Sequence, residues 1–244
     1  MSDLSEPRVF AKSTMPPRRL SGATLQDMTL AVTDDTLAAR RADPRYERLM
    51  KATRAAARKG YDAVSMRELA ETCRLSMTTI YQFCRSKDHL IAEAHLSNME
   101  AFRARISARP PRGATAEARV LSVMRSFAKA LDDEPLSRTL MRAMYSLDPE
   151  VGAAQASVNN VYSSMLDAAI GDDVLENRSA VITTLGHVVD SVILGWLARG
   201  HDTTWVRREL ETAVHVLFSG TATVRRTATR AKHAPARRPV ARRA

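Results

Sequence analysis

The chain has 244 residues, a length that fits one large domain or two ordinary ones. Hydrophobic residues make up 45% of it and charged residues 26%, which excludes wholesale disorder and a fibrous repeat. The 37 Lys and Arg against 27 Asp and Glu give a formal net charge of +10, and such an excess indicates an anionic partner.

The sequence contains no run of about 18 uncharged apolar residues, so it predicts no transmembrane helix and no membrane partner. Residues 1–23 lack the apolar stretch of a signal peptide, so we expect a cytoplasmic protein. Cys73 and Cys84 match no metal-ligand spacing and should stay reduced in that compartment. We therefore expect neither a bound metal nor a cofactor.

The positive charge lies in two separate segments. Residues 44–90 hold ten basic and five acidic residues, and residues 221–244 hold eight basic and no acidic residues. Residues 1–43 are neutral overall, whereas residues 91–220 hold thirteen basic and sixteen acidic residues. A compact basic segment therefore precedes a mildly acidic bulk, and a basic tail follows it.

Both ends of the chain have compositions typical of disorder. Residues 1–43 are rich in Ser, Thr, Pro and Asp and show no sustained hydrophobic period, which predicts a disordered N-terminal arm. Residues 221–244 place Arg pairs between Ala, Thr and Pro, which predicts a basic disordered tail. Such a tail raises solubility or binds phosphates without sequence preference.

The ordered part begins with an amphipathic helix from Pro44 to just before Gly60, because Asp43 can cap it and proline is tolerated at a first helical position. Residues 65–68 form a capping box, which predicts a second, short helix from about Met66.

Two further serines predict the next two helices. Ser76 can cap a third helix with Ile80 and Phe83 on its buried side, and Ser86 can cap a fourth that ends at Pro110. Two short helices joined by a tight turn and held against a longer first helix describe a helix-turn-helix.

The exposed side of the third helix carries side chains suited to reading DNA. Thr methyls and Met77 can contact a thymine methyl, Gln82 can pair with adenine, and Tyr81 and Lys87 can bind phosphates. An ordinary three-helix cluster with a polar face would present a similar pattern, so helix geometry alone leaves both interpretations open.

Three segments carry a family resemblance: YDAVSMRELA at 61–70, LSMTTIYQF at 75–83 and SKDHL at 86–90. They resemble the DNA-binding domain of the TetR family of bacterial transcriptional repressors. The resemblance implies an all-α homodimer of about nine helices, with a helix-turn-helix DNA-binding domain at 44–90 and an effector-binding and dimerisation domain at 91–220. It also implies a repressor that binds a palindromic operator and is released when a small hydrophobic effector displaces the fourth helix.

The same resemblance assigns roles to individual residues. Ser65 and Lys87 would contact phosphates, and Thr79 and Tyr81 would lie on the recognition helix. Arg74 stands where the family has glycine, at a turn whose positive φ costs another residue about 1 kcal/mol, and it would offset that cost by reaching DNA. The predicted DNA-binding residues are Ser65, Arg67, Arg74, Met77, Thr78, Thr79, Tyr81, Gln82 and Lys87.

Three helical patterns follow, at 116–131, 135–147 and 150–170, and they are rich in Met and aromatic residues. Such flexible or amphipathic side chains can line an adaptable apolar cavity, although the same residues also build ordinary cores. The resemblance favours a ligand pocket. The predicted ligand-binding residues are Phe102, Met124, Phe127, Met141, Met144, Tyr145, Tyr162, Met165 and Trp196.

The last two predicted helices, at about 179–199 and 203–219, carry apolar stripes too wide for one neighbour. Gly186 and Gly195 would permit close approach, so these helices suit a four-helix interface between two subunits, which is also where the family dimerises. Full burial inside a monomer is the alternative.

The C-terminal region resembles the actinobacterial KstR-type repressors of cholesterol and fatty-acid catabolism, through residues 196–199 and the closing run at 210–217. This likeness implies a role in lipid metabolism and an acyl or steroid thioester of coenzyme A as effector.

Other functions stay open as alternatives: an activator, a non-specific basic DNA-coating protein, or an α-helical enzyme. No HExxH, GxSxG or phosphate-binding glycine loop occurs, which disfavours the enzyme. His187 and Asp190 could share a site with His215, although a hydrogen-bonded pair at an interface fits them better.

Overall fold

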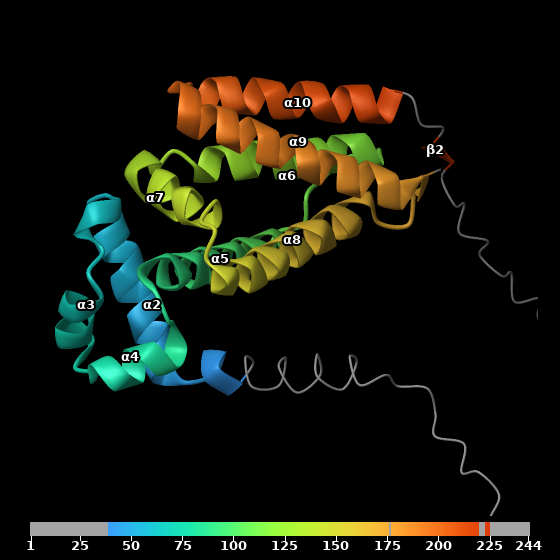
Figure 1. Ribbon diagram of the computed structural model, residues 1–244. Helices are drawn as coiled ribbons and strands as arrows, with labels where there is room; N and C mark the ends of the chain where they lie inside the picture. The colour runs from blue at the N-terminus through green and yellow to red at the C-terminus, as the bar shows by residue number, and fades with distance from the viewer. Residues whose placement is uncertain (1–38, 176, 220–222, 225–244) are drawn as a thin grey trace, which may run out of the picture. The chain divides into compact units, whose positions relative to one another are not determined.

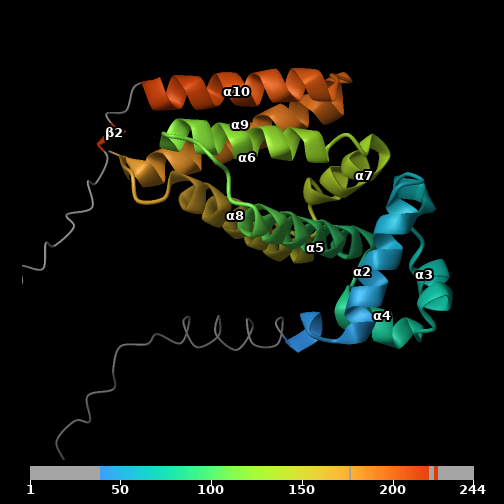
Figure 2. The same ribbon diagram turned by 180° about the vertical axis from the view of Figure 1, so that it is seen from behind.

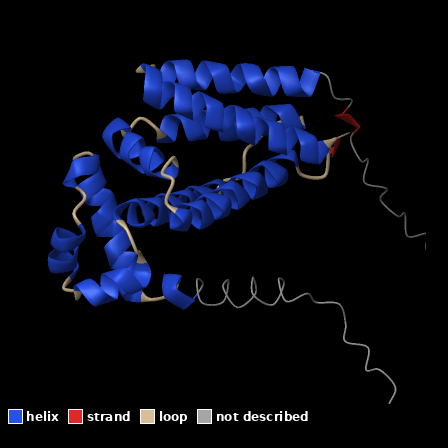
Figure 3. Cartoon of the chain, in the orientation of Figure 1, coloured by secondary structure: helices blue, strands red, loops and turns tan. Residues whose placement is uncertain are grey.

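The computed structural model describes residues 39–175, 177–219 and 223–224. The chain divides into two units, Met1–Asp43 and Pro44–Ala244. The predicted disorder of residues 1–43 falls outside the described residues except at 39–43, where residues 39–41 are helical instead. The predicted disorder of the tail falls outside them except for two residues. The second unit is built from helices joined by short loops (Figure 3).

Nine α-helices lie wholly within the described ranges, and residues 39–41 are helical too, which confirms the all-α class. They are α2 (Pro44–Ala57), α3 (Met66–Cys73), α4 (Met77–Phe83), α5 (Lys87–Ala108), α6 (Ala116–Ala130), α7 (Glu134–Met144), α8 (Pro149–Ile170), α9 (Arg178–Arg199) and α10 (Thr203–Ser219). A 3-10 helix, η1 (Tyr61–Ala63), connects α2 to α3.

Side-chain caps set where the short helices begin. The Ser76 Oγ accepts a hydrogen bond from the Thr79 amide at 3.0 Å, and the Ser86 Oγ accepts one from the His89 amide at 3.0 Å. The Ser65 Oγ bonds the Glu68 amide at a longer 3.4 Å. Each cap satisfies an amide that has no partner within its helix, which is worth about 1 kcal/mol.

The predicted helix at 135–147 was wrong at its end, since α7 stops at Met144. Pro149 follows four residues after Tyr145, and a residue before proline disfavours the helical region. Asp148 accordingly adopts extended backbone angles, with φ −65° and ψ 122°, and becomes the N-cap of α8.

The helices of Pro44–Ala244 form two layers and one end domain. The helix α5 lies alongside α8, while α6, α9 and α10 pack together on one side of that pair, and α2, α3 and α4 cluster at the start of α5 (Figures 1 and 2). One hydrophobic core joins α2, α3 and α4 to the first turns of α5, and a second lies among α5, α6, α8, α9 and α10.

The helix α7 contributes to both cores. Leu136, Leu140 and Ala143 pack into the core of the helix-turn-helix, whereas Met141 packs into the larger core. Because α5 also passes through both, the two parts share two helices. A change in the packing of one core therefore acts directly on the other.

A short antiparallel ladder was not predicted. The strand β1 (Val174–Leu175) pairs with β2 (Thr223–Val224), with Val174 opposite Val224. The prediction that residues 221–244 form a disordered tail was therefore wrong for Thr223 and Val224, because the backbone groups of β1 give these two residues hydrogen-bonding partners.

The helix α9 is long and apolar enough, by length and composition, to cross a membrane, and it is the one such helix in the described ranges. Asp190 interrupts its apolar sequence, which is why a search for an uncharged run does not find it. Leu185, Val189 and Trp196 are buried on one side of α9, which packs against the rest of the chain.

Candidate functional site

The helix α4 presents an exposed face beside a buried one. Ile80 and Phe83 are buried in the core of the helix-turn-helix, while Thr78, Tyr81 and Gln82 are exposed. Tyr81 is 51% exposed, which is high for a large aromatic side chain. None of the nine residues predicted to bind DNA is buried, and their contact with DNA stays a prediction.

The turn between α3 and α4 has the predicted backbone strain. Arg74 is in the left-handed region, with φ 52° and ψ 49°, and its amide bonds the carbonyl oxygens of Ala70 and Glu71. Its side chain is exposed next to the recognition helix. Arg67, also exposed, forms an ion pair of 3.4 Å with Glu71 that solvent largely screens.

Lys87 has a second role besides the predicted phosphate contact. Its ammonium lies 4.0 Å from the centroid of the Tyr61 ring, and the Arg142 guanidinium of α7 lies 4.4 Å from the same centroid. The Tyr61 hydroxyl donates to Asp88, whose other oxygen accepts from Ser146 at 2.7 Å. Burial and the hydrogen bond to Asp88 raise the pKa of Tyr61 to about 12, so it stays a neutral donor.

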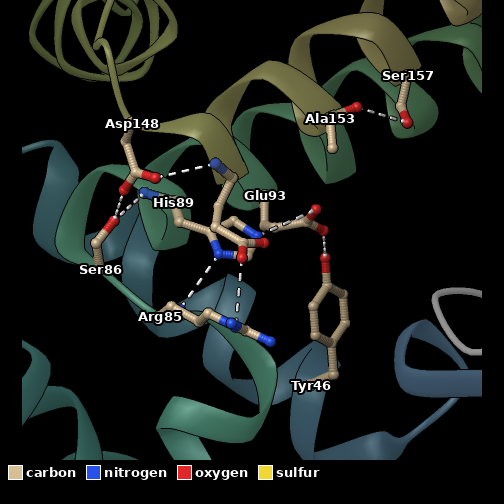
Figure 4. A network of polar contacts seen from close by, with 9 residues as sticks. Tyr46, Arg85, Ser86, His89, Glu93, Asp148, Ala153 and Ser157 are labelled. Carbon is tan, nitrogen blue, oxygen red and sulfur yellow. Dashed lines mark hydrogen bonds and ion pairs between the residues drawn. The ribbon is translucent and has the colours of Figure 1, made fainter. Parts of the chain in front are cut away.

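A polar network links the end of the recognition helix to the start of α8 (Figure 4). The Ser86 hydroxyl, which caps α5, donates to Asp148, which caps α8 by accepting from the Glu150 amide at 2.9 Å. Arg85 also pairs with Glu150 at 3.3 Å. One hydrogen bond therefore joins the caps of the two helices that run side by side, and the bond from Ser86 lowers the pKa of Asp148.

A buried carboxylate ties α2 to α5. Glu93 is 4% exposed and accepts a hydrogen bond from the Tyr46 hydroxyl, and its other oxygen lies 3.8 Å from Nε2 of His89 (Figure 4). A buried carboxylate without partners would be costly, so these contacts fix the packing of the first helix against the fourth.

A cavity of about 190 Å³ lies between α5, α6, α7, α8 and α9. Its lining is mostly apolar, with polar side chains from α8 and α9. It is lined by His95, Met99, Phe127, Met141, Met144, Tyr145, Gln155, Val158, Asn159, Tyr162, Ser163, Ile182, Thr183, Gly186, His187, Val189, Asp190 and Ile193.

Five of the nine residues predicted to bind ligand line this cavity: Phe127, Met141, Met144, Tyr145 and Tyr162. The other four do not. Met124 and Met165 are buried in the larger core, and Phe102 lines only a neighbouring cavity of about 20 Å³. Trp196 is fully buried with the Arg138 guanidinium 4.3 Å from its ring centroid. A Met or aromatic residue at helical spacing fits a core as well as a cavity wall, and the sequence could not separate the two.

The cavity has an exposed polar mouth and a buried apolar interior. Asn159, Thr183, His187 and Asp190 are exposed lining residues, whereas Met99, Phe127, Met141 and Ile193 are buried. The Tyr145 hydroxyl donates to the Asp190 carbonyl oxygen at 3.1 Å, across the mouth. Desolvation there raises the pKa of the Asp190 carboxyl. The sequence prediction missed the polar residues of α8 and α9, because polar residues on a long helix normally indicate a solvated face.

His215 does not join His187 and Asp190, which corrects the alternative site considered above. Its Nδ1 lies 2.6 Å from Glu117 on α6 instead. Within the described ranges, no group of three or more His, Cys, Asp or Glu is placed to hold a metal ion.

The contact between subunits predicted for the two glycines of α9 stays a prediction, and the structure gives their surroundings within one chain. A Cβ at Gly186 would meet nothing within 4 Å, because this residue faces the cavity. A Cβ at Gly195 would lie 3.1 Å from the Trp205 ring, so this glycine lets α10 approach α9 within one chain.

Two family models match the chain in sequence. "Bacterial regulatory proteins, tetR family" matches residues 49–94, and "Tetracyclin repressor-like, C-terminal domain" matches residues 113–217. The first match covers the helix-turn-helix and the start of α5, and the second covers most of the part that holds the cavity.

Similar proteins extend this likeness over most of the chain. The chain is 28% identical over 203 residues to the "HTH-type transcriptional repressor KstR" of Rhodococcus jostii, covering 82% of this chain and 94% of that protein. A TetR transcriptional regulator from Rhodococcus sp. RHA1 matches in structure with a TM-score of 0.60 at 18% identity, over 72% of this chain and 95% of that one. Thermus thermophilus FadR in complex with lauroyl-CoA matches with a TM-score of 0.56 at 18% identity, over 80% and 100%.

Proposed function

Because the chain belongs to the tetR family of bacterial regulatory proteins, it is a ligand-responsive DNA-binding regulator, and we propose that it is a repressor whose effector is a hydrophobic thioester of coenzyme A. One observation carries the proposal: the cavity is lined by α7 and α8, and the loop between them is hydrogen-bonded to the start of α5, directly behind the recognition helix.

DNA recognition is assigned to the exposed face of α4. Thr78, Tyr81 and Gln82 supply a methyl, a hydroxyl and an amide, the groups that bind thymine methyls, phosphates and adenine edges. Arg67 and Arg74 add positive charge beside that face. Uncharged side chains on α4 therefore provide sequence preference, and the neighbouring cations provide affinity for the backbone.

The operator is a palindrome bound by a homodimer, in this proposal, with α9 and α10 forming the interface. Leu194 is 50% exposed and Val216 is 65% exposed, one on each helix. Exposed or half-buried residues recur along α9 every three or four positions, which suits helix-to-helix packing. They are Ala180, Thr184, His187, Ser191, Leu194 and Ala198. This pairing would cover the exposed side of α9, in the cytoplasm.

The effector class follows from the cavity and from the relatives. Its interior is apolar and too small for a nucleotide, so a fatty acyl or steroid group would enter while the rest of the coenzyme stays outside. The Rhodococcus jostii relative is named a repressor, and the Thermus thermophilus structure holds lauroyl-CoA. The first name supports a repressor, and the bound lauroyl-CoA of the second supports a lipid thioester as the inducer.

The release mechanism uses contacts between the two parts. A ligand that spreads α7 and α8 displaces Ser146 and Asp148, and these pull on Asp88 and Ser86 at the start of α5. A small tilt of α5 changes the distance between the paired recognition helices. Successive major grooves require about 34–36 Å, so a change of a few ångströms suffices for release.

The test maps the genomic fragments bound by the purified protein and then measures retardation of one such fragment in gels. Lauroyl-CoA, stearoyl-CoA and a cholestenoyl-CoA are added in turn, with free coenzyme A as the control. We expect at least one thioester to release the DNA and free coenzyme A to leave it bound. Retention of DNA with all three thioesters would contradict the effector class.

A non-specific DNA-coating protein is the second candidate, since the net charge is +10. Purely electrostatic binding collapses as salt rises, whereas base contacts keep a preference for one sequence. Footprints that persist in excess competitor DNA would support the repressor.

A further inference from the structure

His95 is a buried polar side chain in an otherwise apolar part of the cavity wall. It lies on α5, is 3% exposed and lines the cavity with Met99, Phe127 and Met141. Its Nδ1 has no hydrogen-bond partner within the described part of the chain. Leaving a buried donor or acceptor unsatisfied costs free energy. A bound molecule that forms a hydrogen bond with this nitrogen would remove that cost.

The protonation state of His95 narrows the choice of partner. Burial lowers the pKa of its imidazole to about 4, so the ring is neutral near pH 7. A neutral imidazole offers one N–H donor and one acceptor nitrogen. It can therefore bind a hydroxyl in either direction, or donate to a keto oxygen.

The rest of the lining argues against an anion in the interior. No Lys or Arg occurs among the residues that line the cavity, and Asp190 at its mouth is the one carboxylate. A buried carboxylate or phosphate would find no cation there, which makes its desolvation costly. The part of the ligand that reaches His95 is therefore uncharged.

The size of the cavity sets the size of that part. An engineered lysozyme cavity of about 150 Å³ binds benzene, and the cavity here is about 190 Å³. A fused ring or a folded chain fits. The neighbouring cavity of about 20 Å³ shares the His95, Met99, Phe127 and Met141 walls, and it has room for about one water molecule.

We propose that His95 selects effectors that carry an uncharged oxygen, a hydroxyl or a keto group, on the end buried in the cavity. This inference rests on the proposed function, because it takes the cavity to be the effector site. It favours an oxygenated ring or chain over a plain saturated acyl chain. His95 would then determine specificity, and the apolar walls would supply most of the affinity.

The test uses three probes of nearly one shape: 2-naphthol, naphthalene and 2-naphthoate. Their binding to the full-length protein is measured by fluorescence titration at pH 7.5. We expect 2-naphthol to bind about tenfold more tightly than naphthalene, and 2-naphthoate to bind most weakly. In His95→Phe the hydroxyl preference should fall to within about twofold, and His95→Gln, which keeps a donor and an acceptor, should restore it.

Two glycine variants show whether the probes occupy the cavity. Gly186→Leu directs a side chain into the cavity, and its Cβ meets nothing within 4 Å, so both neutral probes should lose affinity. Gly152→Leu places the same side chain on the exposed side of α8, where a Cβ also meets nothing within 4 Å, and should leave binding unchanged. Thermal unfolding of each variant confirms that it is folded.

The outcomes separate the two proposals. Equal binding of 2-naphthol and naphthalene to the wild-type protein overturns the role of His95 and leaves the effector cavity standing, provided Gly186→Leu blocks both. A hydroxyl preference that persists in His95→Phe also overturns it, because another group or a water molecule would hold the oxygen. Absence of any binding, or binding insensitive to Gly186→Leu, overturns this inference together with the proposed effector site.

Discussion

The helix-turn-helix and the cavity region differ in whether their buried polar atoms have hydrogen-bond partners. Thr53, His89 and Glu93 lie in or beside the first core, and each has a hydrogen bond or a close charged partner. The two buried side-chain atoms without a partner in the described ranges are Nδ1 of His95 and Nε1 of Trp196, both in the part of the chain that holds the cavity. His95 lines the cavity and Trp196 does not, so one unsatisfied atom lies in the candidate ligand site.

The largest expected effect tests the DNA-binding side of this comparison. Replacing both Thr79 and Tyr81 with Ala should abolish retardation of a bound genomic fragment, since each base or phosphate contact is lost in both subunits and good contacts are worth about 1–3 kcal/mol each. The unfolding midpoint should change little. Thr72→Ala, a change at an exposed residue near the end of α3, is the control. Unchanged retardation by the double variant would remove α4 from the DNA surface.

The second prediction concerns the cavity region, where Nδ1 of His95 has no hydrogen-bond partner within the described ranges. The pKa of His95 is lowered to about 4 in the folded protein. Between about pH 6.5 and 4, its imidazole is therefore protonated in the unfolded chain and neutral in the folded chain. Folding stability from this group is therefore present above about pH 6.5 and is lost as the pH falls. Between pH 7.5 and 4.5 the loss should reach about 3 kcal/mol.

Urea unfolding at those two pH values measures this loss, and His95→Phe is the comparison variant. The variant should lose about 3 kcal/mol less than the wild-type protein over the same range. An identical pH dependence of the wild-type protein and His95→Phe would mean that the His95 environment is polar. The two regions would then not differ in their buried polar groups as described above.

A third prediction addresses the connection between the two regions. Asp148→Ala removes the cap of α8 and its bond to Ser86, which should cost about 1 kcal/mol of stability. It should also raise the thioester concentration needed to release DNA, while DNA affinity without ligand stays the same. Ser157→Ala, whose hydroxyl bonds only the Ala153 carbonyl of its own helix, serves as control in the same gel titration.

If Asp148→Ala released DNA at the same thioester concentration as the wild-type protein, the coupling would run elsewhere. The remaining connection between the regions is then the shared packing of α5 and α7.

The smallest effect tests how far the helix-turn-helix tolerates strain. Arg74→Gly relieves the left-handed backbone and should raise stability by no more than about 1 kcal/mol, because glycine also loses more backbone entropy on folding. Arg74→Ala keeps the strain and removes the charge. Thermal unfolding separates the two, and both should weaken DNA binding if the side chain reaches a phosphate. Undiminished binding by both would leave the strain without a functional reason.

Local signals predicted most of the fold. Ser76 and Ser86 cap helices within three residues of themselves, and Asp43 with Pro44 marks a start, so these boundaries need no tertiary information. The exposed face of α4 could also be predicted, since Ile80 and Phe83 mark the buried side of that helix.

The cavity was harder to predict because its walls come from five helices. Met124 and Met141 have the same chemistry and both pack into the larger core, yet Met141 lines the cavity and Met124 does not. A mid-helix glycine was the available signal: Gly186 leaves space that no side chain fills, although the sequence pattern suggested helix contact instead. Likewise, the unpaired nitrogen of His95 depends on neighbours far away in the chain.

The position of α7 in two cores has a consequence for how this protein can be divided. A fragment ending after α5 would lack Leu136, Leu140 and Ala143, and the core of its helix-turn-helix would be open to water on that side. The DNA-binding segment is thus a poor transplantable module. Chimaeras that exchange operator specificity between relatives should carry α7 along with residues 44–108, and random recombination that separates them should yield few soluble repressors.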